Sequence, residues 1–291
     1  MNLNHQHKIR IGACGWSFEE WREVFYPRDL PASEWLSWYS RFLPTVEIDS
    51  TFYAAPQPGA ILRWVEETPA HFRFSCKLPR EITHRRRLRD CTAELQDFLR
   101  AIEPLTPKLR VILVQLPPAF SPRDGKASLR AFLAKLPHDF RFAIEFRHAG
   151  WHRPEIIRLL EKHHVCWVWA DTSPLNERNL APFEFQPQTS DFLYVRLLGD
   201  YSTKYDGDGK HLHRYGKLLW KREAALESWV LKMERQLPEV RALYLYANNH
   251  FEGFAPETCQ RVAERLGFQL PLPATAELAS EPADRAQLDL L

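Results

Sequence analysis

The chain lacks the short motifs that most easily identify a nucleotide-binding or metal-dependent enzyme. It has no Gly-x-Gly-x-x-Gly sequence and no Gly-x-x-x-x-Gly-Lys-Ser/Thr loop, which excludes the usual dinucleotide fingerprint and the P-loop. The zinc-protease sequence His-Glu-x-x-His is absent as well. Any function must therefore be argued from the placement of individual residues.

Cysteines are few, and long apolar runs are missing. The 5 cysteines are an odd number and include no Cys-x-x-Cys, so neither a disulfide framework nor a zinc ribbon is indicated. No run approaches the roughly 18 apolar residues of a membrane-spanning helix. Residues 1–8 lack the apolar stretch of a signal peptide. We therefore expect a soluble cytoplasmic protein with buried free thiols and no membrane partner.

The net charge of +2 is too small to indicate nucleic-acid binding by itself, but basic residues are unevenly distributed. Residues 77–89 contain a single acid, and residues 204–222 form a second basic segment. Such segments are most often solvated faces, with phosphate binding as the alternative. The residues of the first segment that would contact phosphates are Arg85, Arg86, Arg87 and Arg89.

Short runs rich in apolar and β-branched residues recur along the chain and end abruptly in charged or amide residues. The strands predicted from them are 9–15, 45–50, 73–77, 111–115, 142–147, 165–170, 192–197 and 242–247. Stretches with helical spacing of apolar residues lie between them. Eight strand–helix units in 291 residues favour an α/β fold, a single-domain (β/α)8 TIM-like barrel.

Side chains alternate along a strand, so the apolar residues indicate which polar ones face the barrel interior. Val46 and Ile48 should face the helices, which directs Glu47 and Asp49 inward. The same argument applies to the other strands. Together with the polar residues at or just after the strand ends, it predicts a polar site at the carboxyl ends of the strands. The residues expected to line it are Glu47, Asp49, Lys77, Gln115, Glu145, Arg147, Asp171, Arg196 and Asn248.

The mixture of charges at this predicted site favours acid–base chemistry on an anionic substrate. Arg147 and Arg196 would bind a carboxylate or phosphate. The catalytic residues would be Glu145, Glu47, Lys77 and Asp171, with a hydrolase, lyase or isomerase reaction left open. An internal ion-pair network that only satisfies the barrel's charged layer is the structural alternative.

No metal and no cofactor are predicted. Lys77, Arg147 and Arg196 would pair with the carboxylates and repel a divalent ion. Gly150 and Pro154 follow His148 and indicate a loop, so its His-x-x-x-His spacing with His152 carries little weight, and we expect His148 to contact substrate. Trp16 and Tyr53 each follow a strand, where an aromatic ring either stacks on a ligand or packs within the loops.

The same segments resemble the DUF72 (YecE-like) family of barrel proteins, whose function is unassigned. The resemblance spans about residues 9–267 and rests on ordered blocks of sequence. They are Gly15-Trp16-Ser17, Phe25-Tyr26-Pro27, Glu47-Ile48-Asp49-Ser50-Thr51-Phe52-Tyr53, Ile82-Thr83-His84, Gln115-Leu116-Pro117-Pro118, Glu145-Phe146-Arg147-His148, Tyr194-Val195-Arg196-Leu197 and Asn248-Asn249. The resemblance implies the barrel fold and adds His84 to the expected substrate-binding residues.

Two residues that could take part in the chemistry differ from those that are typical of the family. The family typically has Asn where this chain has Asp49, and His where it has Leu198. If that histidine transfers protons in the family, Leu198 removes it here. The resemblance itself supplies no reaction.

The two ends of the chain are expected to lie outside the barrel domain, 9–267. Residues 1–8 and the Pro/Ala-rich residues 268–291 are predicted to be flexible. The final five residues resemble the peptide that docks into the bacterial sliding clamp. Its docking residues would be Gln287, Leu288, Leu290 and Leu291.

Two functions from different classes follow. The first is an enzyme, or a diverged enzyme, acting on a phosphorylated, carboxylated or nucleotide-like substrate at the carboxyl ends of the strands. The second is a DNA-associated protein recruited by its terminal peptide and contacting phosphates through the basic segment 77–89.

Overall fold

The computed structural model describes residues 3–54, 56–172, 186–199 and 215–279. Within them the chain forms one sheet of parallel strands in the order β6-β5-β4-β3-β2-β1-β9-β8-β7. The strands are β1 (Ile9–Cys14), β2 (Thr45–Ile48), β3 (Arg73–Lys77), β4 (Leu109–Gln115), β5 (Phe142–Glu145), β6 (Cys166–Trp167), β7 (Trp169–Thr172), β8 (Phe192–Gly199) and β9 (Ala242–Ala247).

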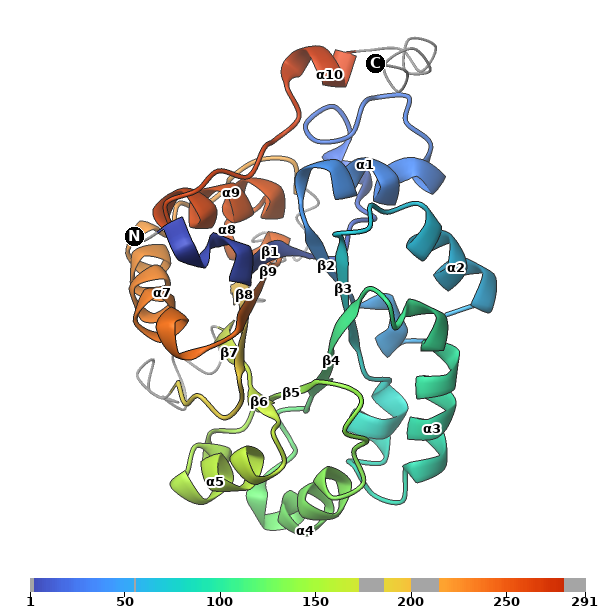
Figure 1. Cartoon of the computed structure of the whole chain (residues 1–291), viewed down its shortest axis with the longest axis vertical. Coiled ribbons are helices and arrows are strands. Elements are labelled where there is room, and N and C mark those ends of the chain that lie inside the picture. The colour runs from blue at the N-terminus through green and yellow to red at the C-terminus, as the bar shows by residue number, and fades with distance from the viewer. Residues whose placement is uncertain (1–2, 55, 173–185, 200–214, 280–291) are drawn as a thin grey trace, which may run out of the picture.

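The sheet curls into a nearly closed barrel, as Figure 1 shows. The sixth predicted strand, 165–170, is divided at Val168 into β6 and β7. β6 pairs with β5, while β7 pairs with β8, so this one segment joins the two edges of the sheet. The predicted α/β TIM-like barrel is therefore confirmed, with one of its eight strands divided in two.

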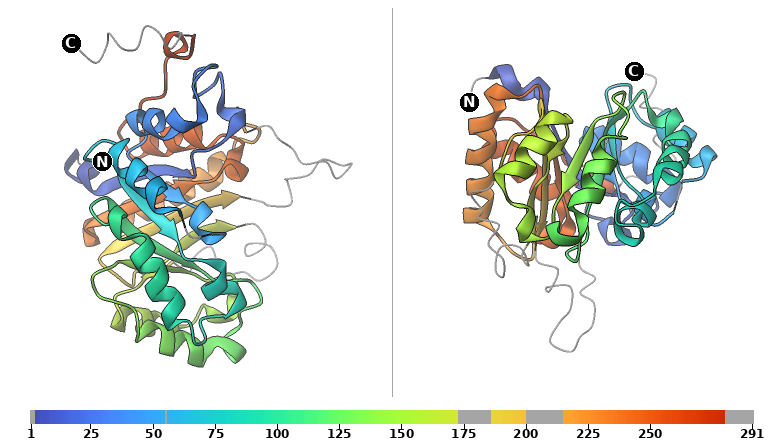
Figure 2. Two further views of the ribbon diagram at one scale, coloured as in Figure 1. Left: turned by 90° about the vertical axis from the view of Figure 1, so that its right-hand side faces the viewer. Right: turned by 90° about the horizontal axis from the view of Figure 1, so that it is seen from below.

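Helices surround the strands on the outside of the barrel (Figure 2). They are α1 (Trp35–Phe42), α2 (Pro58–Glu66), α3 (Thr92–Ala101), α4 (Pro122–Leu133), α5 (Pro154–Lys162), α7 (Glu223–Gln236), α8 (Asn249–Glu252) and α9 (Ala255–Arg265). A further helix, α10 (Thr275–Ala279), stands away from the barrel (Figure 1). Proline occupies the first turn of α4, α5 and α9, where a missing backbone N–H costs nothing. Among the described residues, no helix combines the length and apolar composition needed to cross a membrane.

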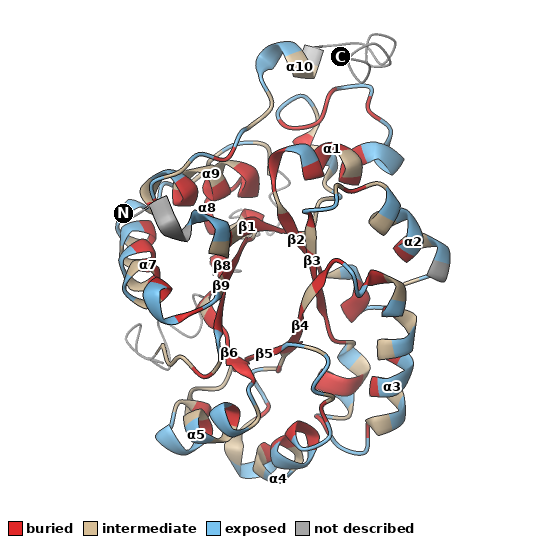
Figure 3. Ribbon diagram, viewed as in Figure 1, coloured by how far each residue is buried: buried red, intermediate tan, exposed pale blue. Residues whose placement is uncertain are grey.

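Alternation along the strands produces two separate apolar layers. Val46 and Ile48 belong to the layer between strands and helices, as predicted. A smaller cluster lies inside the barrel and includes Val111, Leu113 and Tyr194. Figure 3 shows the result: the strands are buried, and the helices are buried on the faces toward them. The interior thus holds a mainly apolar cluster, and the charged side chains lie toward its ends.

The segments predicted to be flexible pack partly against the barrel where the structure describes them. Residues 3–8 form a 3-10 helix, and Lys8 donates a hydrogen bond to the carbonyl of Val240 at 3.2 Å. Beyond residue 267, Leu270 is only 8% exposed, and the side chain of Leu272 also contacts the apolar layer. The barrel domain therefore continues past its predicted end. Residues 280–291, which include the predicted clamp-docking peptide, lie outside the described residues.

Gly12 provides a test of how tightly β1 and β2 approach. A Cβ atom at Gly12 would lie 1.8 Å from the carbonyl oxygen of Thr45, which cannot move without breaking strand pairing. We expect Gly12→Ala to lower the free energy of unfolding in urea by about 3 kcal/mol or more, because overpacking a strand contact displaces backbone. Gly59→Ala is the control, since nothing lies within 4 Å of its Cβ position in α2. A similar loss in both variants would contradict this account.

Candidate active site

The buried guanidinium of Arg196 organises the carboxyl ends of the strands. Arg196 lies on β8 and is 2% exposed. Its Nη2 is 2.6 Å from Glu47 Oε1, on β2, and its Nη1 is 2.5 Å from Glu145 Oε2, on β5. Both carboxylates are fully buried. Three strands that are distant in sequence are therefore joined through one side chain, with all three residues facing inward as the alternation predicted.

The two carboxylates have different proton affinities. Burial alone would raise the pKa of Glu145, but contacts with Arg147 and Arg196 lower that pKa to about 2. At Glu47 burial prevails and the pKa is raised, although Arg196 opposes the shift. The second oxygen of Glu47 accepts a hydrogen bond from the hydroxyl of Tyr194 at 2.6 Å. Glu145 is therefore held ionised by two arginines, which argues against a proton-transfer role for it.

Lys77 and Asp49 lie at the edge of this network. Lys77 is 9% exposed, and its Nζ is 3.8 Å from Asp49 Oδ1 and 4.1 Å from the centre of the Phe52 ring. Asp49 Oδ1 is buried and has no hydrogen-bond partner among the described residues. Burial lowers the pKa of Lys77, and nearby Arg196 adds to the effect while Asp49 opposes it. Lys77 is thus a cation held by weak partners.

The end of β3 is fixed by a side chain from the turn that follows β2. The hydroxyl of Thr51 donates to the carbonyl of Lys77 at 2.7 Å and accepts from its backbone N–H at 3.1 Å. Phe52, the next residue, supplies the ring beneath the ammonium group. The position of Lys77 is therefore set by two neighbouring strand ends.

His84 adds a neutral ring beside Lys77. It lies in the π-helical turn Glu81–Arg85 after β3, with its ring 4.9 Å from that of Phe52. Burial lowers the pKa of His84 to about 4, and the nearby cations Lys77, Arg80 and Arg147 add to the effect. This side of the site therefore has a positive electrostatic field.

Two further predicted residues have local structural contacts. Asn248 caps α8, accepting a hydrogen bond from the backbone of His250 at 3.0 Å. His148 caps a short turn by accepting from the backbone N–H of Gly150 through Nδ1 at 3.0 Å. Both lie directly after strands, as expected, but each uses one polar atom to hold its own loop.

The remaining predicted residues differ in how far they are buried. Gln115 Oε1 is 3.4 Å from Nη1 of Arg196 and so extends the buried network. The Trp16 ring packs edge-on against Trp64 at 5.5 Å, within the outer apolar layer. Tyr53 is 73% exposed. Of the two aromatic rings predicted to stack on a ligand, only Tyr53 is widely accessible.

The structure corrects the placement of Asp171. Its Oδ2 accepts a hydrogen bond at 2.7 Å from the indole N–H of Trp229, which lies on α7. Alternation explains this outcome, since Trp169 packs in the outer layer, while Ala170 packs against the inner cluster. Asp171 therefore points toward the helices, and its predicted place beside Glu47 is wrong.

Several interior polar residues were not predicted. Tyr246 shares hydrogen bonds with Ser75 at 2.8 Å and with Thr45 at 3.0 Å, below the Arg196 network. Tyr194 bonds Glu47 from the same strand as Arg196. The sequence carries a signal for it, because Tyr194 precedes Arg196 by one full alternation and must share its face.

Cys14, Glu47 and Asp49 form the one group among the described residues with ligand atoms close enough to hold a metal ion. Nη2 of Arg196 lies in the same place, 2.6 Å from Glu47, 3.8 Å from Asp49 and 4.0 Å from Cys14 Sγ. Burial, with Glu47 next in importance, raises the pKa of the Cys14 thiol well above its usual range. A guanidinium among these atoms and a protonated thiol are poorly suited to a divalent ion.

Two of the four predicted phosphate-contacting arginines, Arg85 and Arg86, have acidic partners. Arg86 is 2.6 Å from Glu94 and 3.6 Å from Glu81, and Arg85 is 3.0 Å from Glu81. Arg89 donates to the carbonyl of Asp124 at 2.8 Å. The ion pairs of Arg85 and Arg86 are typical of a solvated face that neutralises part of its own charge, whereas the carbonyl contact of Arg89 leaves its charge in place.

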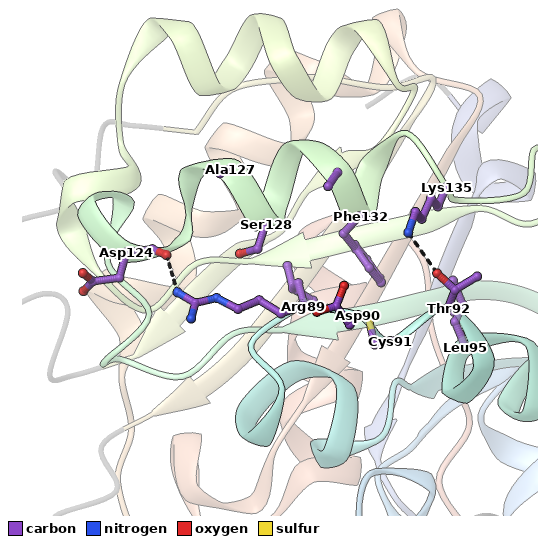
Figure 4. Close-up of a pocket in the computed structure, with 12 residues that line it drawn as sticks. Arg89, Asp90, Cys91, Thr92, Leu95, Asp124, Ala127, Ser128, Phe132 and Lys135 are labelled. Carbon is purple, nitrogen blue, oxygen red and sulfur yellow. Dashed lines mark hydrogen bonds between the residues drawn. The ribbon is translucent and has the colours of Figure 1, made fainter.

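A separate pocket of about 430 Å³ lies on the outside of the barrel between α3 and α4. Figure 4 shows its apolar floor, including Phe132 and Leu95, and the polar groups at its rim. Lys135 donates to the hydroxyl of Thr92 at 3.1 Å, so this part of the rim is satisfied internally. None of the residues that line this pocket belongs to the Arg196 network.

Comparisons with known proteins give a family without a known activity. A family model described as "Protein of unknown function DUF72" matches residues 10–282. The chain is 37% identical to the UPF0759 protein YecE of Escherichia coli strain K12 over 173 residues, 58% of this chain and 61% of that protein. It thus spans less than two thirds of that relative. It is 27% identical to the UPF0759 protein YunF of Bacillus subtilis strain 168, over 90% of this chain and 95% of that protein.

The fold is also found among solved structures. A DUF72 family protein of Thermotoga maritima has a TM-score of 0.74 and 27% sequence identity to this chain. The alignment covers 89% of this chain and 99% of that one. The barrel architecture is therefore shared across nearly the whole of both chains.

Removing the arginine at the centre of the network should destabilise the fold strongly. Arg196→Met leaves Glu47 and Glu145 buried without their shared cation, so we expect a loss of about 3–5 kcal/mol in the free energy of urea unfolding. Arg85→Met is the control, because its ion pair is exposed and should contribute little. Equal losses in the two variants would contradict the central role of Arg196.

The depressed pKa of Glu145 predicts a pH dependence. A carboxyl group whose folded-state pKa lies below its unfolded value stabilises the fold above the unfolded value and loses that effect as pH falls. With a folded pKa of about 2, Glu145 should contribute about 3 kcal/mol above pH ~5, lost between pH ~5 and ~2. The measurement is the difference in unfolding free energy between wild type and Glu145→Gln across this range.

We expect that difference to shrink on acidification, because protonated Glu145 resembles glutamine. Glu155→Gln, at an exposed ion pair with Lys126, is the matched control and should show a much smaller pH-dependent difference. A wild-type-to-Glu145→Gln difference that is constant from pH 5 to 2 would be inconsistent with the depressed pKa.

Proposed function

This chain belongs to the DUF72 family, whose function is unknown, and we propose from its site that it is an acid–base enzyme for a small anionic substrate. The single observation that carries the proposal is the state of Lys77. Its amine is nearly buried, rests on the Phe52 ring, and has a lowered pKa beside Asp49. A lysine whose pKa is lowered in this way gives up a proton more readily than an exposed lysine does.

The other charged groups support Lys77 rather than compete with it. Both oxygens of Glu145 are held by arginines, and Arg196 is enclosed by its two carboxylates. These groups position the site. We assign proton transfer to Lys77, with Asp49 as its charge partner. Glu47 has a raised pKa, but it is held by Arg196 and Tyr194 and stays part of the buried network. The proposal gives Asp171 no catalytic role, because its Oδ2 accepts a hydrogen bond from Trp229 on α7.

The positive side of the site favours an anionic substrate. Lys77, Arg80 and Arg147 together outweigh Glu145 in their effect on the pKa of His84. A carboxylate or phosphate would be attracted to this side, where Arg147 retains 15% side-chain exposure. His84 stays uncharged near pH 7 and can exchange hydrogen bonds with the substrate. Tyr53 would cover the substrate from the solvent side.

The Leu198 position fits this assignment of roles. Leu198 is fully buried in the inner apolar cluster, on the same face of β8 as Arg196. The histidine that the family resemblance implies at this place is replaced by a side chain without a proton to transfer. Chemistry in this chain therefore depends on the β3 side of the site, where Lys77 and His84 lie.

The DNA-associated alternative is not favoured by a specific observation. Its basic segment is paired with Glu81 and Glu94, and its terminal peptide lies outside the described residues. A cytoplasmic location remains part of the proposal, in keeping with free buried cysteines.

The proposal is tested through Lys77. We expect Lys77→Met to reduce kcat for any substrate found by about 10²–10⁴-fold, the usual contribution of a positioned proton carrier. Substrates would be sought in a thermal-shift panel of sugar phosphates, nucleotides and small carboxylates at fixed salt. Lys126→Met is the control, because its ion pair with Glu155 is on the surface. Undiminished turnover by Lys77→Met would reject the proposal.

A second measurement needs no substrate. Labelling of Lys77 by an amine reagent, followed by mass spectrometry across pH, should give a midpoint below the usual value for lysine, because burial lowers its pKa. Asp49→Asn should move that midpoint lower still, since Asp49 is the strongest group favouring the charged form. A midpoint unchanged by Asp49→Asn would remove Asp49 as the charge partner.

A further inference from the structure

Four arginines gather at the opposite end of the barrel from the candidate active site. Arg10 lies near the start of β1, Arg73 starts β3, Arg110 follows the first residue of β4, and Arg141 directly precedes β5. Because all strands are parallel, these positions lie at one pole, the amino-terminal end. Tyr244 of β9, paired with Arg10, completes the group.

Three of the four arginines have no carboxylate within ion-pair distance among the described residues. Arg10 donates to the carbonyls of His7 and Ile9 at 3.1 Å. Arg73 and Arg110 likewise donate only to nearby backbone carbonyls. The candidate active site, by contrast, places a carboxylate beside each of its buried cations. The positive charge at this pole is therefore not neutralised by these residues.

Arg141 is the member of the group that has an acidic partner. It lies 3.4 Å from Asp191, which Arg241 also approaches, at 3.8 Å. One carboxylate is thus shared by two arginines. The pole retains an excess of guanidinium groups even with Asp191 counted.

Two of these arginines, Arg110 and Arg141, line a pocket of about 410 Å³, and Arg10 and Arg73 lie at the same pole outside its lining. Its lining includes Arg110, Arg141, Tyr244, Phe140 and Thr106, together with one acidic residue, Asp139. The volume is sufficient for a phosphate chain of two or three groups together with water. The lining supplies the guanidinium groups of Arg110 and Arg141 and the hydroxyl-bearing residue Tyr244. Guanidinium and hydroxyl groups are the usual donors to phosphoryl oxygens.

The arginines also act on one another. After burial, the largest effects lowering the pKa of Arg73 come from Arg110 and Arg10. Mutual repulsion of this kind destabilises the fold unless an anion reduces it. Gathering more guanidinium groups than carboxylates at one pole is therefore better explained by a ligand than by structural pairing.

We propose that the amino-terminal pole of the barrel, built from Arg10, Arg73, Arg110 and Arg141, is a binding site for a small oligophosphate. Pyrophosphate is the smallest molecule with the required chemistry, and the terminal phosphates of a nucleotide share it. The site lies across the barrel from Lys77 and does not depend on the function proposed there.

The experiment measures pyrophosphate binding by calorimetry at constant ionic strength, with ATP as a second ligand. We expect Arg110→Gln and Arg73→Gln each to raise the Kd for pyrophosphate by about tenfold or more, because each removes a charge-assisted hydrogen-bond donor. Arg85→Gln changes the net charge equally and should leave Kd unchanged. Lys77→Met should also bind normally, which distinguishes this pole from the active site.

The outcomes decide the proposal. A weak anion site has a Kd of roughly 1 mM. If the wild-type protein binds no pyrophosphate at concentrations up to about 10 times that Kd, the proposal is overturned. Equal weakening by Arg85→Gln would show diffuse charge attraction and would overturn it as well. If Arg110→Gln is unfolded by circular dichroism, Arg73→Gln carries the test. Equal affinities for pyrophosphate and ATP would assign binding to the phosphates alone, and tighter ATP binding would assign it to a nucleotide.

Discussion

The contact of one buried guanidinium with two buried carboxylates constrains the rest of this barrel. Arg196 can be accommodated at 2% exposure only because Glu47 and Glu145 neutralise it from across the interior. The carboxylates depend on the arginine in the same way, since each is fully buried. This requirement sets which residues of β2, β5 and β8 face inward, and it places the polar layer above the inner apolar cluster.

The same network determines which groups remain available for chemistry. Charges that hold each other inside a low-dielectric interior are poor proton carriers, because changing the protonation of one leaves its partners unpaired. Glu145 is the clearest case, as its pKa of about 2 shows. Lys77 and Asp49 lie at the rim of the network, 3.8 Å apart and with weaker partners. Their protonation can change at a smaller cost, which is why the proposed chemistry centres on them.

The two ends of the barrel differ in how far their cationic side chains are paired with acids. Among the described residues at the carboxyl ends of the strands, each buried cation has an acid nearby, and the excess of positive charge is confined to the side around His84. At the amino-terminal pole, Arg10, Arg73 and Arg110 donate to carbonyls and to no acid within the described part of the chain. A balanced site suits a substrate that must arrive and leave, whereas an unbalanced one favours an anion that stays bound. The solved structure of the Thermotoga relative shares the barrel in which this contrast is built.

The alternation of apolar and polar residues by itself determined the barrel and the inward direction of Glu47, Glu145 and Arg196, because a strand must bury one face against helices. Alternation would also have placed Asp171 outward, had it been followed past Ala170. Only the tertiary structure decided which charges meet. Arg196 is 149 residues from Glu47 and 51 from Glu145, and no local pattern specifies such pairs. The lowered pKa of Lys77 likewise depends on burial and on charges from other strands, which exist only after the barrel has closed.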